Sequence, residues 1–344
     1  MIILLLILAL TSIYGLRFSS FHADYMQPAQ TTAIKGIFAV IILLSHMSGY
    51  VHWSTGLDVL GYKIIGLIGQ LMVTMFFFYS GFGILESWRR KPDYAKNFFR
   101  QRFLKILVHF DLALVLYAIL NVLLGISYSV IDYLLCWIGW GSIGNSNWFV
   151  FDTLSFYLLT LAAMYIGRKA RLQEKSFCLI ITILCIALWY VLKQVRGLQE
   201  EWWYNTIFCF PAGIWYSVFK EKVDTFARKT VLWLLGLVVL AAIFLALYFS
   251  NGVLSYTLCS AVFCVLVVWV TMKLKLCNNV LEWLGTNSFS IYILQRIPMI
   301  IFSHFGLNSK PYVFAALVIF SIFPLSAGFT WILNRIDRRI FRKM

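Results

Sequence analysis

Long apolar segments recur along this chain from one end to the other, and they limit its fold more than any other feature. We identify eleven, most of them close to the roughly 20 residues that an α-helix needs to cross the hydrocarbon core of a bilayer. The predicted spans are residues 1–16, 34–52, 62–85, 106–126, 148–167, 176–192, 206–219, 230–250, 253–272, 284–305 and 312–333. Because 61% of the 344 residues are hydrophobic and only 12% are charged, a water-soluble fold could not bury this much apolar surface. The runs are continuous rather than alternating, so the sequence predicts an all-α, polytopic membrane protein and not a β-barrel.

The basic residues indicate how these spans are oriented. Of the 29 Lys and Arg residues, 24 fall at the ends or in the connections on one side of the predicted membrane. The five exceptions are Lys63, Lys193, Arg196, Arg296 and Lys310. Cytoplasmic connections are enriched in Lys and Arg, so the basic side faces the cytoplasm, with the N-terminus outside and the C-terminus inside. Membrane topology therefore accounts for the net charge of +15, and we expect no nucleic-acid partner.

No low-complexity linker, long soluble loop or internal repeat divides the chain, which predicts one helical membrane domain. The first apolar segment has no basic residue before it and no A-x-A motif after it, so we expect an uncleaved helix rather than a signal peptide. The seven cysteines form no C-x-x-C pair, and most fall within predicted spans, where Cys behaves as a small apolar residue. We expect neither a disulfide nor a metal site.

One segment, IKGIFAVIILLSHMSGY at residues 34–50, places a histidine deep in an apolar run. Lys35 begins this predicted span at the cytoplasmic face, and His46 follows 11 residues later. On a helix this spacing is a rise of roughly 16 Å and about three turns, with only ~20° of residual rotation, so the two side chains share one stripe. Ionisable residues inside a membrane usually face a cavity or a partner. His46 is either a neutral residue that donates a hydrogen bond to a neighbouring helix or a functional group at mid-membrane.

A basic, aromatic stretch follows the third span, in the segment KPDYAKNFFRQRFLKIL at residues 91–107. Its cations Arg100, Arg102 and Lys105 recur at short helical spacings beside phenylalanines. Such a stretch can bind anionic lipid headgroups at the cytoplasmic surface. It can equally hold a phosphorylated cytosolic cofactor, because the paired N–H groups of Arg match phosphate oxygens. The span before it contains SGFG at residues 80–83, small residues that let helices approach closely or line a cavity.

These motifs occur in an order that resembles the membrane acyltransferase-3 family, whose members acylate bacterial surface glycans and related acceptors. A basic residue, ten residues and a His come first, followed by an FF-x-x-SGF segment and then by R-x-x-(R/K) at the next cytoplasmic helix. NSNWFVFDTLSFYLL at 145–159 is similar to the family's WF…Y span, and LEWLGTNSFSIYILQRIPMI at 281–300 is similar to its late LG-x-x-S-(F/Y)-x-x-Y-L segment. The resemblance covers about residues 31–335. It implies a ten-helix acyltransferase core within residues 31–344, preceded at 1–30 by an additional transmembrane helix and its cytoplasmic connection.

The resemblance also implies a reaction and the residues that carry it. The family's R-x10-H pair appears here as Lys35 and His46, and its R-x-x-R pair as Arg102 and Lys105. His46 is then the catalytic residue: a general base for an acceptor hydroxyl that attacks the thioester of acyl-CoA, or an acyl-histidine nucleophile. Lys35, Arg102 and Lys105 are then the residues that bind the phosphates of CoA. Acyl-CoA, with acetyl expected, is a donor substrate, and no permanently bound cofactor is expected.

Candidates for the acceptor site lie near the opposite face. Asp152 could orient a sugar hydroxyl or make a structural hydrogen bond, and Trp148 could stack on a sugar or belong to an interfacial aromatic belt. Many relatives carry a His where this chain has Gln295 followed by Arg296. Arg296 could bind a negatively charged acceptor, or it could pair with Asp152 or Asp111. The expected partners are a cell-surface or lipid-linked saccharide and membrane lipids, for a multi-pass protein of the bacterial plasma membrane.

Two other classes of function remain open from the sequence. A transporter or flippase for a lipid-linked glycan would use Lys35, His46 and Arg296 as a polar path, although the internal repeat typical of such folds is not evident. A non-catalytic scaffold or sensor would give Lys35 and His46 no reason to share a stripe. His109 and Asp111 point to different sides of a helix, and one of them could reach His46 or the CoA channel. A thioester-hydrolysis assay on the purified protein separates the enzyme from both alternatives.

Overall fold

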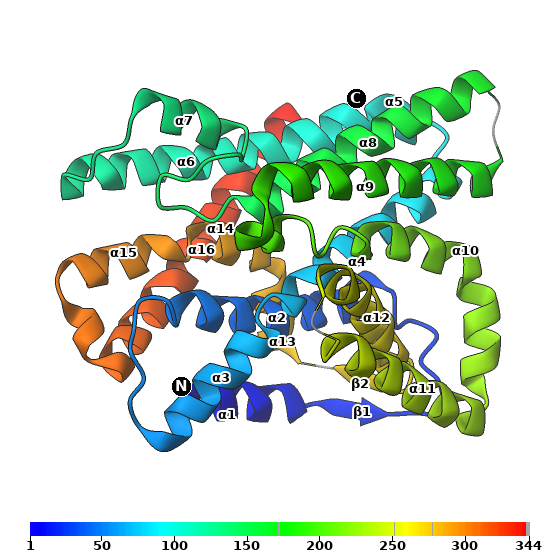
Figure 1. Ribbon diagram of the computed structural model, residues 1–344, viewed down its shortest axis with the longest axis horizontal. Helices are drawn as coiled ribbons and strands as arrows, with labels where there is room; N and C mark the ends of the chain where they lie inside the picture. Colours follow the sequence, from blue (N-terminus) through cyan, green and yellow to red (C-terminus); the bar gives the residue numbers. More distant parts are fainter. Residues whose placement is uncertain (171–172, 251, 277, 342–344) are drawn as a thin grey trace.

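In the computed structural model, which describes residues 1–170, 173–250, 252–276 and 278–341, the chain is almost entirely helical (Figure 1). The longer helices are α1 (Ile2–Ile13), α2 (Pro28–Met47), α3 (Gly56–Ile68), α4 (Leu71–Arg90), α6 (Lys105–Leu124), α8 (Trp148–Ala170), α9 (Glu174–Arg196), α10 (Cys209–Arg228), α11 (Thr230–Tyr248), α12 (Val253–Thr271) and α16 (Pro311–Ile340). The shorter pieces are α5 (Tyr94–Phe98), the π-helix η1 (Phe99–Leu104), α7 (Val130–Trp137), the 3-10 helix η2 (Leu198–Trp203), α13 (Asn279–Thr286), α14 (Ser288–Leu294), α15 (Arg296–His304) and the 3-10 helix η3 (Leu307–Ser309). Two short strands are β1 (Leu16–Phe18) and β2 (Leu274–Leu276). Three of the basic residues and one cysteine counted in the sequence lie outside the described residues: Arg171, Arg342, Lys343 and Cys277.

The prediction of an all-α, polytopic membrane protein is confirmed, while the count of spans is less simple than predicted. Among the described residues, eight helical segments are long and apolar enough to cross a membrane. They are Pro28–Met47, Gly56–Arg90, Tyr94–Leu124, Trp148–Gly167, Glu174–Arg196, Thr230–Tyr248, Val253–Thr271 and Pro311–Ile340. The other three predicted spans correspond to α1, which has only 12 residues, to α10, and to the interrupted segment α13–α15. Helix α10 ends in the charged sequence KEKVDTFAR, which lowers its hydropathy.

Helix α2 begins earlier than the sequence predicts. We expected a span over residues 34–52 with Lys35 at its start, but α2 starts at Pro28 and ends at Met47. A proline is favoured in the first helical turn because its fixed φ suits a helix and its missing N–H would have no partner there. Lys35 therefore lies about two turns inside the helix, where its side chain is half-buried.

The late span predicted over residues 284–305 is divided into α13, α14 and α15, and the last interruption falls at Gln295. Pro298 accounts for this interruption, because its ring clashes with the carbonyl group four residues earlier, at Leu294, and it has no N–H to donate. The break makes Arg296 the first residue of α15.

Two pairs of helices cross with their backbones in contact, and each crossing depends on glycine. At Gly81 of α4, an added Cβ atom would lie 2.1 Å from the carbonyl oxygen of Phe210 on α10. Gly213 of α10 makes the reciprocal approach, with 2.0 Å from a Cβ atom to a backbone oxygen of α4. Helices α2 and α13 cross in the same way, through Gly36 and Gly285. Only glycine leaves room for this contact, so the SGFG segment does provide a close helix approach.

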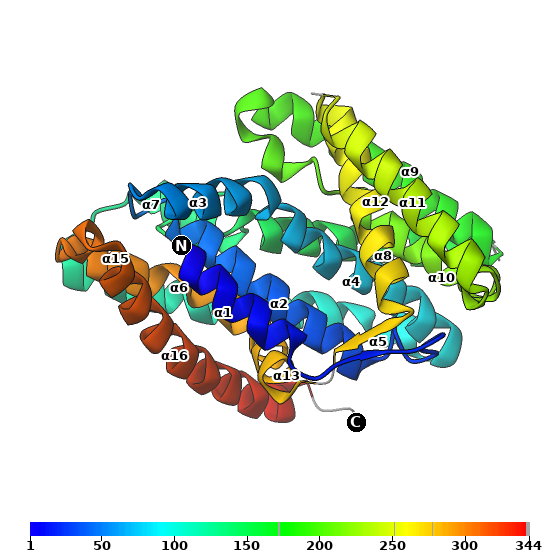
Figure 2. The ribbon, with the colours of Figure 1, turned by 90° about the horizontal axis from the view of Figure 1, so that it is seen from below.

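Residues 1–30 pack against the core of the molecule. Helix α1 contacts α2, α3 and α13, and Figure 2 shows it lying along α2. Strand β1 pairs with β2 in antiparallel register, with Arg17 opposite Lys275. Lys275 also pairs with Asp24, and the hydrogen bond from its ammonium group lowers the pKa of the Asp24 carboxyl. The first connection of the chain is thereby tied to the connection between α12 and α13.

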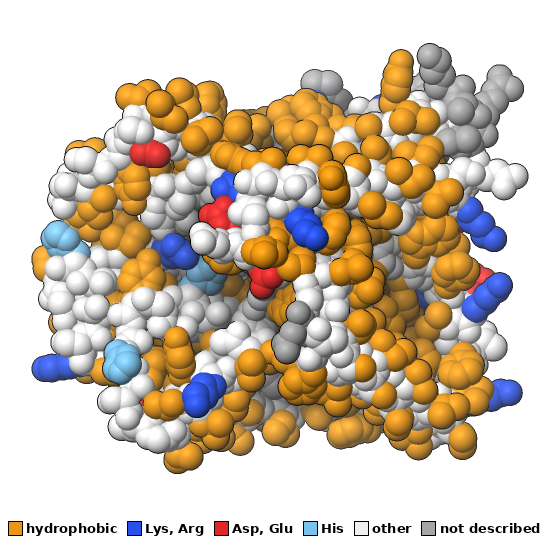
Figure 3. Space-filling model, in the orientation of Figure 1, with side chains coloured by type: hydrophobic (Ala, Val, Ile, Leu, Met, Phe, Trp, Pro, Cys, Tyr) orange, Lys and Arg blue, Asp and Glu red, His pale blue; other side chains and the backbone are white. Residues whose placement is uncertain are grey.

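The outer surface is suited to lipid. Apolar side chains are spread over the face shown in Figure 3, most densely on its right and lower parts, and charged side chains are sparse on it. Helix α11 has no buried residue, although its sequence is apolar almost throughout. An apolar helix with no protein covering it is stable only where the surrounding medium is itself apolar.

Candidate functional site

Helix α2 carries Lys35, Ala39, Ile42 and His46 on one stripe, as their spacing of three or four residues requires. Lys35, Ala39 and Ile42 line a cavity of about 320 Å³, which we name the central cavity. His46, one turn further along, lines a space of about 470 Å³ that we name the tryptophan cavity. Lys35 also lines a space of about 980 Å³ near the start of the helix, the basic vestibule. One helix therefore borders all three spaces in succession.

The basic vestibule is formed mainly by α2, α4, α10 and the loop before α2. Its cations are Lys35, Arg89, Arg90, Lys91, Arg102 and Lys220. Four residues line both the vestibule and the central cavity, and they mark the passage between the two: Lys35, Tyr79, Ser80 and Arg102. Among the described residues, neither Lys35 nor Arg102 forms an ion pair with a carboxylate, whereas other cations of this region do. Two cations without a carboxylate partner can hold a polyanion at this passage.

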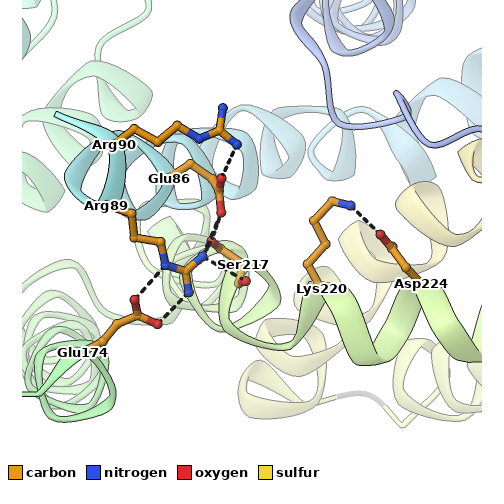
Figure 4. A network of polar contacts seen from close by, with 7 residues as sticks. All are labelled: Glu86, Arg89, Arg90, Glu174, Ser217, Lys220 and Asp224. Carbon is orange, nitrogen blue, oxygen red and sulfur yellow. Dashed lines mark hydrogen bonds and ion pairs between the residues drawn. The ribbon is translucent and has the colours of Figure 1, made fainter.

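Three other cations of the vestibule, Arg89, Arg90 and Lys220, are already paired (Figure 4). The Arg89 guanidinium donates to both oxygens of Glu174, at 2.7 Å from Nε and 2.6 Å from Nη2, and from Nη1 to Glu86 at 2.8 Å. Lys220 forms an ion pair with Asp224 at 2.5 Å. Arg89 thus joins α4 to α9 and holds the wall of the vestibule in place. Its positive charge is compensated, in contrast to that of the two cations at the passage.

Tyr25 fixes the loop that forms the edge of the vestibule. Its hydroxyl group donates to Asp224 at 2.5 Å and lies 2.8 Å from the hydroxyl of Tyr216. The ammonium group of Lys220, which pairs with the same carboxylate, lies 4.7 Å from the centre of the Tyr25 ring. Burial raises the pKa of Tyr25 above its ordinary value, so the phenol keeps its proton and remains a donor to Asp224.

The central cavity is lined mostly by apolar side chains. Beyond α2, its apolar lining comes from α4, α6, α8 and α14, namely Val73, Phe76, Ile106, Phe149, Val150, Phe289 and Tyr292. Polar groups gather at the end nearest the vestibule, where the Ser80 and Tyr157 hydroxyls lie 3.3 Å apart. A space of this kind is unfavourable for an ion and favourable for an uncharged, flexible chain.

The tryptophan cavity has a different character. Four indoles line it, from Trp140, Trp148, Trp202 and Trp203, together with the amide side chains of Asn145 and Asn147. The guanidinium of Arg196 is stacked between the rings of Trp140 and Trp203, at 3.6 and 3.7 Å from their centres, and it pairs with Glu200 at 3.0 Å. Aromatic faces combined with neutral hydrogen-bonding groups suit a ligand that presents both C–H surfaces and hydroxyls.

Arg296 meets His46 in this cavity. Its Nη2 atom lies 3.4 Å from His46 Nδ1, and both side chains are half-buried and line the tryptophan cavity. From the sequence, Arg296 could have paired with Asp152 or Asp111. Among the described residues, neither carboxylate forms an ion pair with Arg296. Pro298 signals in the sequence that the helix is interrupted near Arg296, but it does not indicate that His46 is the partner.

A ring contact lies between the central cavity and the tryptophan cavity. Tyr292 lines the central cavity, is almost fully buried, and meets the ring of His46 edge-on at 6.2 Å between centroids. It also meets Phe149 edge-on at 5.1 Å, and the residue before Phe149, Trp148, faces the tryptophan cavity. Tyr292 therefore lies beside His46 on the central-cavity side and contacts Phe149, and we name these two rings the ring partition. Tyr292 belongs to the family-like motif at residues 281–300, but the sequence alone indicated no role for it.

Lys105 does not share the surroundings of Lys35 and Arg102. Its ammonium group pairs with Asp337 on α16 at 2.6 Å, and His109 Nε2 lies 2.8 Å from the other oxygen of the same carboxylate. His109 therefore contacts Asp337 rather than His46 in this structure. Arg102 lies in the π-helix η1 while Lys105 starts the following α-helix, and such π-helical turns often occur at functional sites. Asp337 was not identified from the sequence, because it lies more than 200 residues away along the chain.

Two of the three acceptor candidates, Trp148 and Arg296, line the tryptophan cavity beside His46. The third, Asp152, is fully buried one turn further along α8, and neither carboxylate oxygen has a hydrogen-bond partner among the described residues. It is not one of the residues that line this cavity. Asp111 has one such unpartnered oxygen on α6.

No group of three or more His, Cys, Asp or Glu side chains among the described residues could hold a metal ion. The six described cysteines are buried and unpaired, at positions 136, 178, 185, 209, 259 and 264.

Comparison with protein-family models gives a match to an acyltransferase domain over residues 31–335. This range covers most of the chain and includes His46, Lys35, Arg102 and Arg296. No curated protein and no solved structure matches the chain. The matched range leaves out α1 and contains the three cavities almost entirely. The chain therefore belongs to the acyltransferase-3 family of membrane acyltransferases.

Proposed function

We propose that this protein transfers an acyl group, expected to be acetyl, from cytosolic acyl-CoA to a hydroxyl of a cell-surface or lipid-linked saccharide, with His46 as general base. The observation that carries the proposal is the order of spaces along α2: basic vestibule, apolar central cavity, ring partition, and a tryptophan cavity that contains His46. The donor and acceptor of such a reaction differ in charge and in the side of the membrane from which they come. The spaces differ in charge, and the distribution of basic residues predicts that they also open toward different sides.

The basic vestibule and the central cavity suit the successive parts of acyl-CoA, from its phosphates to its thioester. Lys35 and Arg102, which have no carboxylate partner in the described structure, would hold phosphate groups at the passage out of the vestibule. The uncharged arm that joins the phosphates to the thioester would lie in the apolar central cavity. Helix geometry puts His46 roughly 16 Å beyond Lys35, so the thioester at the end of this arm approaches the ring partition. Tyr292 would have to move aside for the thioester carbonyl to reach His46.

The acceptor side supplies the base and a surface for the sugar. A neutral imidazole takes the proton of the acceptor hydroxyl as its oxygen attacks the thioester carbonyl, and later returns a proton to the departing thiolate. Trp148 and its neighbouring indoles would pack on the apolar faces of sugar rings, while Asn145 and Asn147 would bond to hydroxyls. Acyl transfer through an acyl-histidine intermediate is the variant of this mechanism.

The test measures thioester cleavage of acetyl-CoA by the purified protein in lipid nanodiscs, with release of free thiol as the readout. A second assay measures acetyl transfer in native membranes. His46→Ala should abolish both activities, while His304→Ala, at the exposed end of α15, should leave both unchanged. Expression and thermal midpoint should be retained in His46→Ala, because the smaller apolar side chain is cheaper to bury. Wild-type rates in that variant would remove His46 from the reaction.

A flippase for a lipid-linked glycan is the second candidate, and one observation favours it. Interrupted helices such as α13–α15 also occur at the substrate sites of transporters. A flippase would move a labelled lipid-linked saccharide between leaflets without consuming acetyl-CoA. Movement of the saccharide with no thiol release, in the same nanodisc preparation reconstituted into vesicles, would replace the acyltransferase proposal.

A further inference from the structure

Arg296 is the charged group that lies closest to His46, and its role is unexplained by the family motif. The guanidinium is half-buried in the tryptophan cavity, with Nη2 at 3.4 Å from His46 Nδ1. Its Nε atom is buried without a hydrogen-bond partner, and among the described residues no carboxylate lies within ion-pair distance of it. The molecule thus keeps a cation with unused donors beside its proposed base, at the cost of burying it.

The contact also specifies which atom of His46 is available. A guanidinium has only donors, so a hydrogen bond at this contact requires Nδ1 to accept and the proton of the neutral ring to be on Nε2. A separation of 3.4 Å is longer than the usual 2.7–3.2 Å of such bonds, which makes the contact weak and easily displaced. The lone pair that can receive a proton therefore points toward the Arg296 guanidinium, and the acceptor hydroxyl would have to displace this weak contact.

On the basis of the proposed acyl transfer, we infer that Arg296 is a second catalytic residue: its guanidinium binds the oxyanion formed when the acceptor hydroxyl attacks the thioester. In that step the hydroxyl oxygen bonds to the carbonyl carbon, the C=O π-electron pair moves to the carbonyl oxygen, and the hydroxyl proton passes to His46 Nδ1. The intermediate then collapses, the C–S bond breaks, and the thiolate takes the proton from the imidazolium. The products are an ester and a free thiol, so atoms and charges balance.

This arrangement explains why both groups lie at one junction. The oxyanion and the hydroxyl oxygen are attached to the same carbon, so the base and the oxyanion donor must lie within a few ångströms of each other. Preorganised donors of this type stabilise the charge that develops in the transition state without needing to reorganise. Arg296 begins α15 directly after the interruption at Gln295, for which Pro298 accounts, and its guanidinium reaches His46 from there.

The experiment measures hydrolysis of acetyl-CoA by water, with no saccharide present, in nanodiscs containing the full chain. Arg296→Gln should lower kcat by about 10²–10³-fold, the usual effect of removing an oxyanion donor, and change KM for acetyl-CoA less than about threefold. Arg296→Lys should keep part of the rate, and free guanidinium added to Arg296→Ala should restore part of it. Arg335→Gln, which removes a guanidinium stacked on Trp331 of α16, is the matched control and should be unaffected.

Arg296 could bind the oxyanion, or it could anchor an anionic acceptor. Hydrolysis by water separates these two roles, because water carries no negative group for Arg296 to bind. Wild-type hydrolysis in Arg296→Gln, with loss of transfer to saccharide alone, would overturn the inference and make Arg296 an anchor for an anionic acceptor. If Arg296→Gln fails to fold, the guanidinium rescue and Arg296→Lys decide the question. A wild-type kcat in Arg296→Lys, together with no rescue by guanidinium, would contradict an oxyanion role.

If wild-type protein hydrolyses acetyl-CoA too slowly, the same variants are compared by acetyl transfer in native membranes. There KM for acetyl-CoA should again stay constant while kcat falls. Absence of thioester cleavage in wild type under both conditions would instead refute the proposed function itself.

Discussion

Lys35 and Lys105 show how the surroundings of a charge decide what it can do. Both follow from the same family-like pattern, and both lie near the vestibule end of the molecule. Lys105 has a carboxylate at 2.6 Å on a neighbouring helix, so its charge is compensated. Lys35 lines the passage between two cavities with Arg102 and has no ion-pair partner in the described structure. Charge alone was visible in the sequence, but the compensating Asp337 could be found only from the packing of α6 on α16.

Lys35→Ala and Arg102→Ala should each raise KM for acetyl-CoA roughly 10-fold or more, because a hydrogen bond between two charged groups contributes about 1.5–3 kcal/mol. The kcat values should change much less, since neither side chain reaches His46. Lys35→Arg should be tolerated, because it keeps the charge and restores the family residue. Initial rates of thiol release across a range of acetyl-CoA concentrations give both constants.

Lys105→Ala separates the sequence-based expectation from the structural one. Because its ammonium group pairs with Asp337, we expect KM for acetyl-CoA to change less than in Lys35→Ala, while the thermal midpoint falls slightly as the carboxylate loses a partner. An increase in KM equal to that of Arg102→Ala would return Lys105 to the donor site. Unchanged KM in all three Ala variants would reduce the cluster to an anchor for lipid headgroups.

At the scale of elements, the two glycine crossings hold the cavity walls in register. α4 and α10 supply most of the vestibule wall and touch through Gly81 and Gly213, while α2, which carries Lys35 and His46, touches α13 through Gly36. The SGFG segment predicted that α4 makes either a close contact or a cavity wall. It makes both, because Gly81 faces α10 and Gly83 lines the vestibule. Which helix would be the partner could not be predicted, since a small residue indicates proximity without saying to what.

Gly81→Ala should lower stability by about 1–3 kcal/mol, the typical effect of overpacking, because its Cβ atom would lie 2.1 Å from a backbone oxygen that cannot move alone. Gly83→Ala is the matched control on the same helix, since an added Cβ atom there meets nothing within 4 Å. It should be neutral or stabilising by up to about 1 kcal/mol, as expected for removal of a helical glycine. Thermal midpoints in one detergent compare the two, and equal losses would contradict a tight crossing at Gly81.

The helix boundaries show where local sequence rules succeed and where they fail. Span positions followed from apolar runs, because the bilayer sets a minimum length for them. The start of α2 was placed six residues too late, since the residues from Pro28 to Ala33 are not apolar enough to count as lipid-facing although they are helical. The interruption at Gln295 was also missed, although Pro298 was present as a signal. A helix in a protein interior needs no apolar face toward lipid, so hydropathy alone cannot delimit it.

For the whole molecule, the reaction depends on which face of the membrane each cavity opens to. Positive residues favour a cytoplasmic vestibule. In a cysteine-free background, single cysteines at the exposed positions Gln199 and Ser309 should react with an impermeant thiol reagent on intact cells. Cysteines at Asp93 and Arg338, also exposed, should react only after the cells are permeabilised. The reverse pattern would place the vestibule outside, beyond the reach of cytosolic acyl-CoA, and would leave the transporter ahead.

The ring partition has a consequence for the cell that does not involve acyl chemistry. Cavities that open to opposite faces and met in a continuous file of water would conduct protons, and each charge that crosses dissipates about 2.3 kcal/mol per 100 mV of membrane potential. Tyr292 and Phe149 have ring centres 5.1 Å apart, and under the proposed function they would stand across that path at rest. If the rings moved apart for the reaction, a donor arm in the central cavity would occupy the space that they leave. The substrate would then keep the membrane electrically tight during its own turnover.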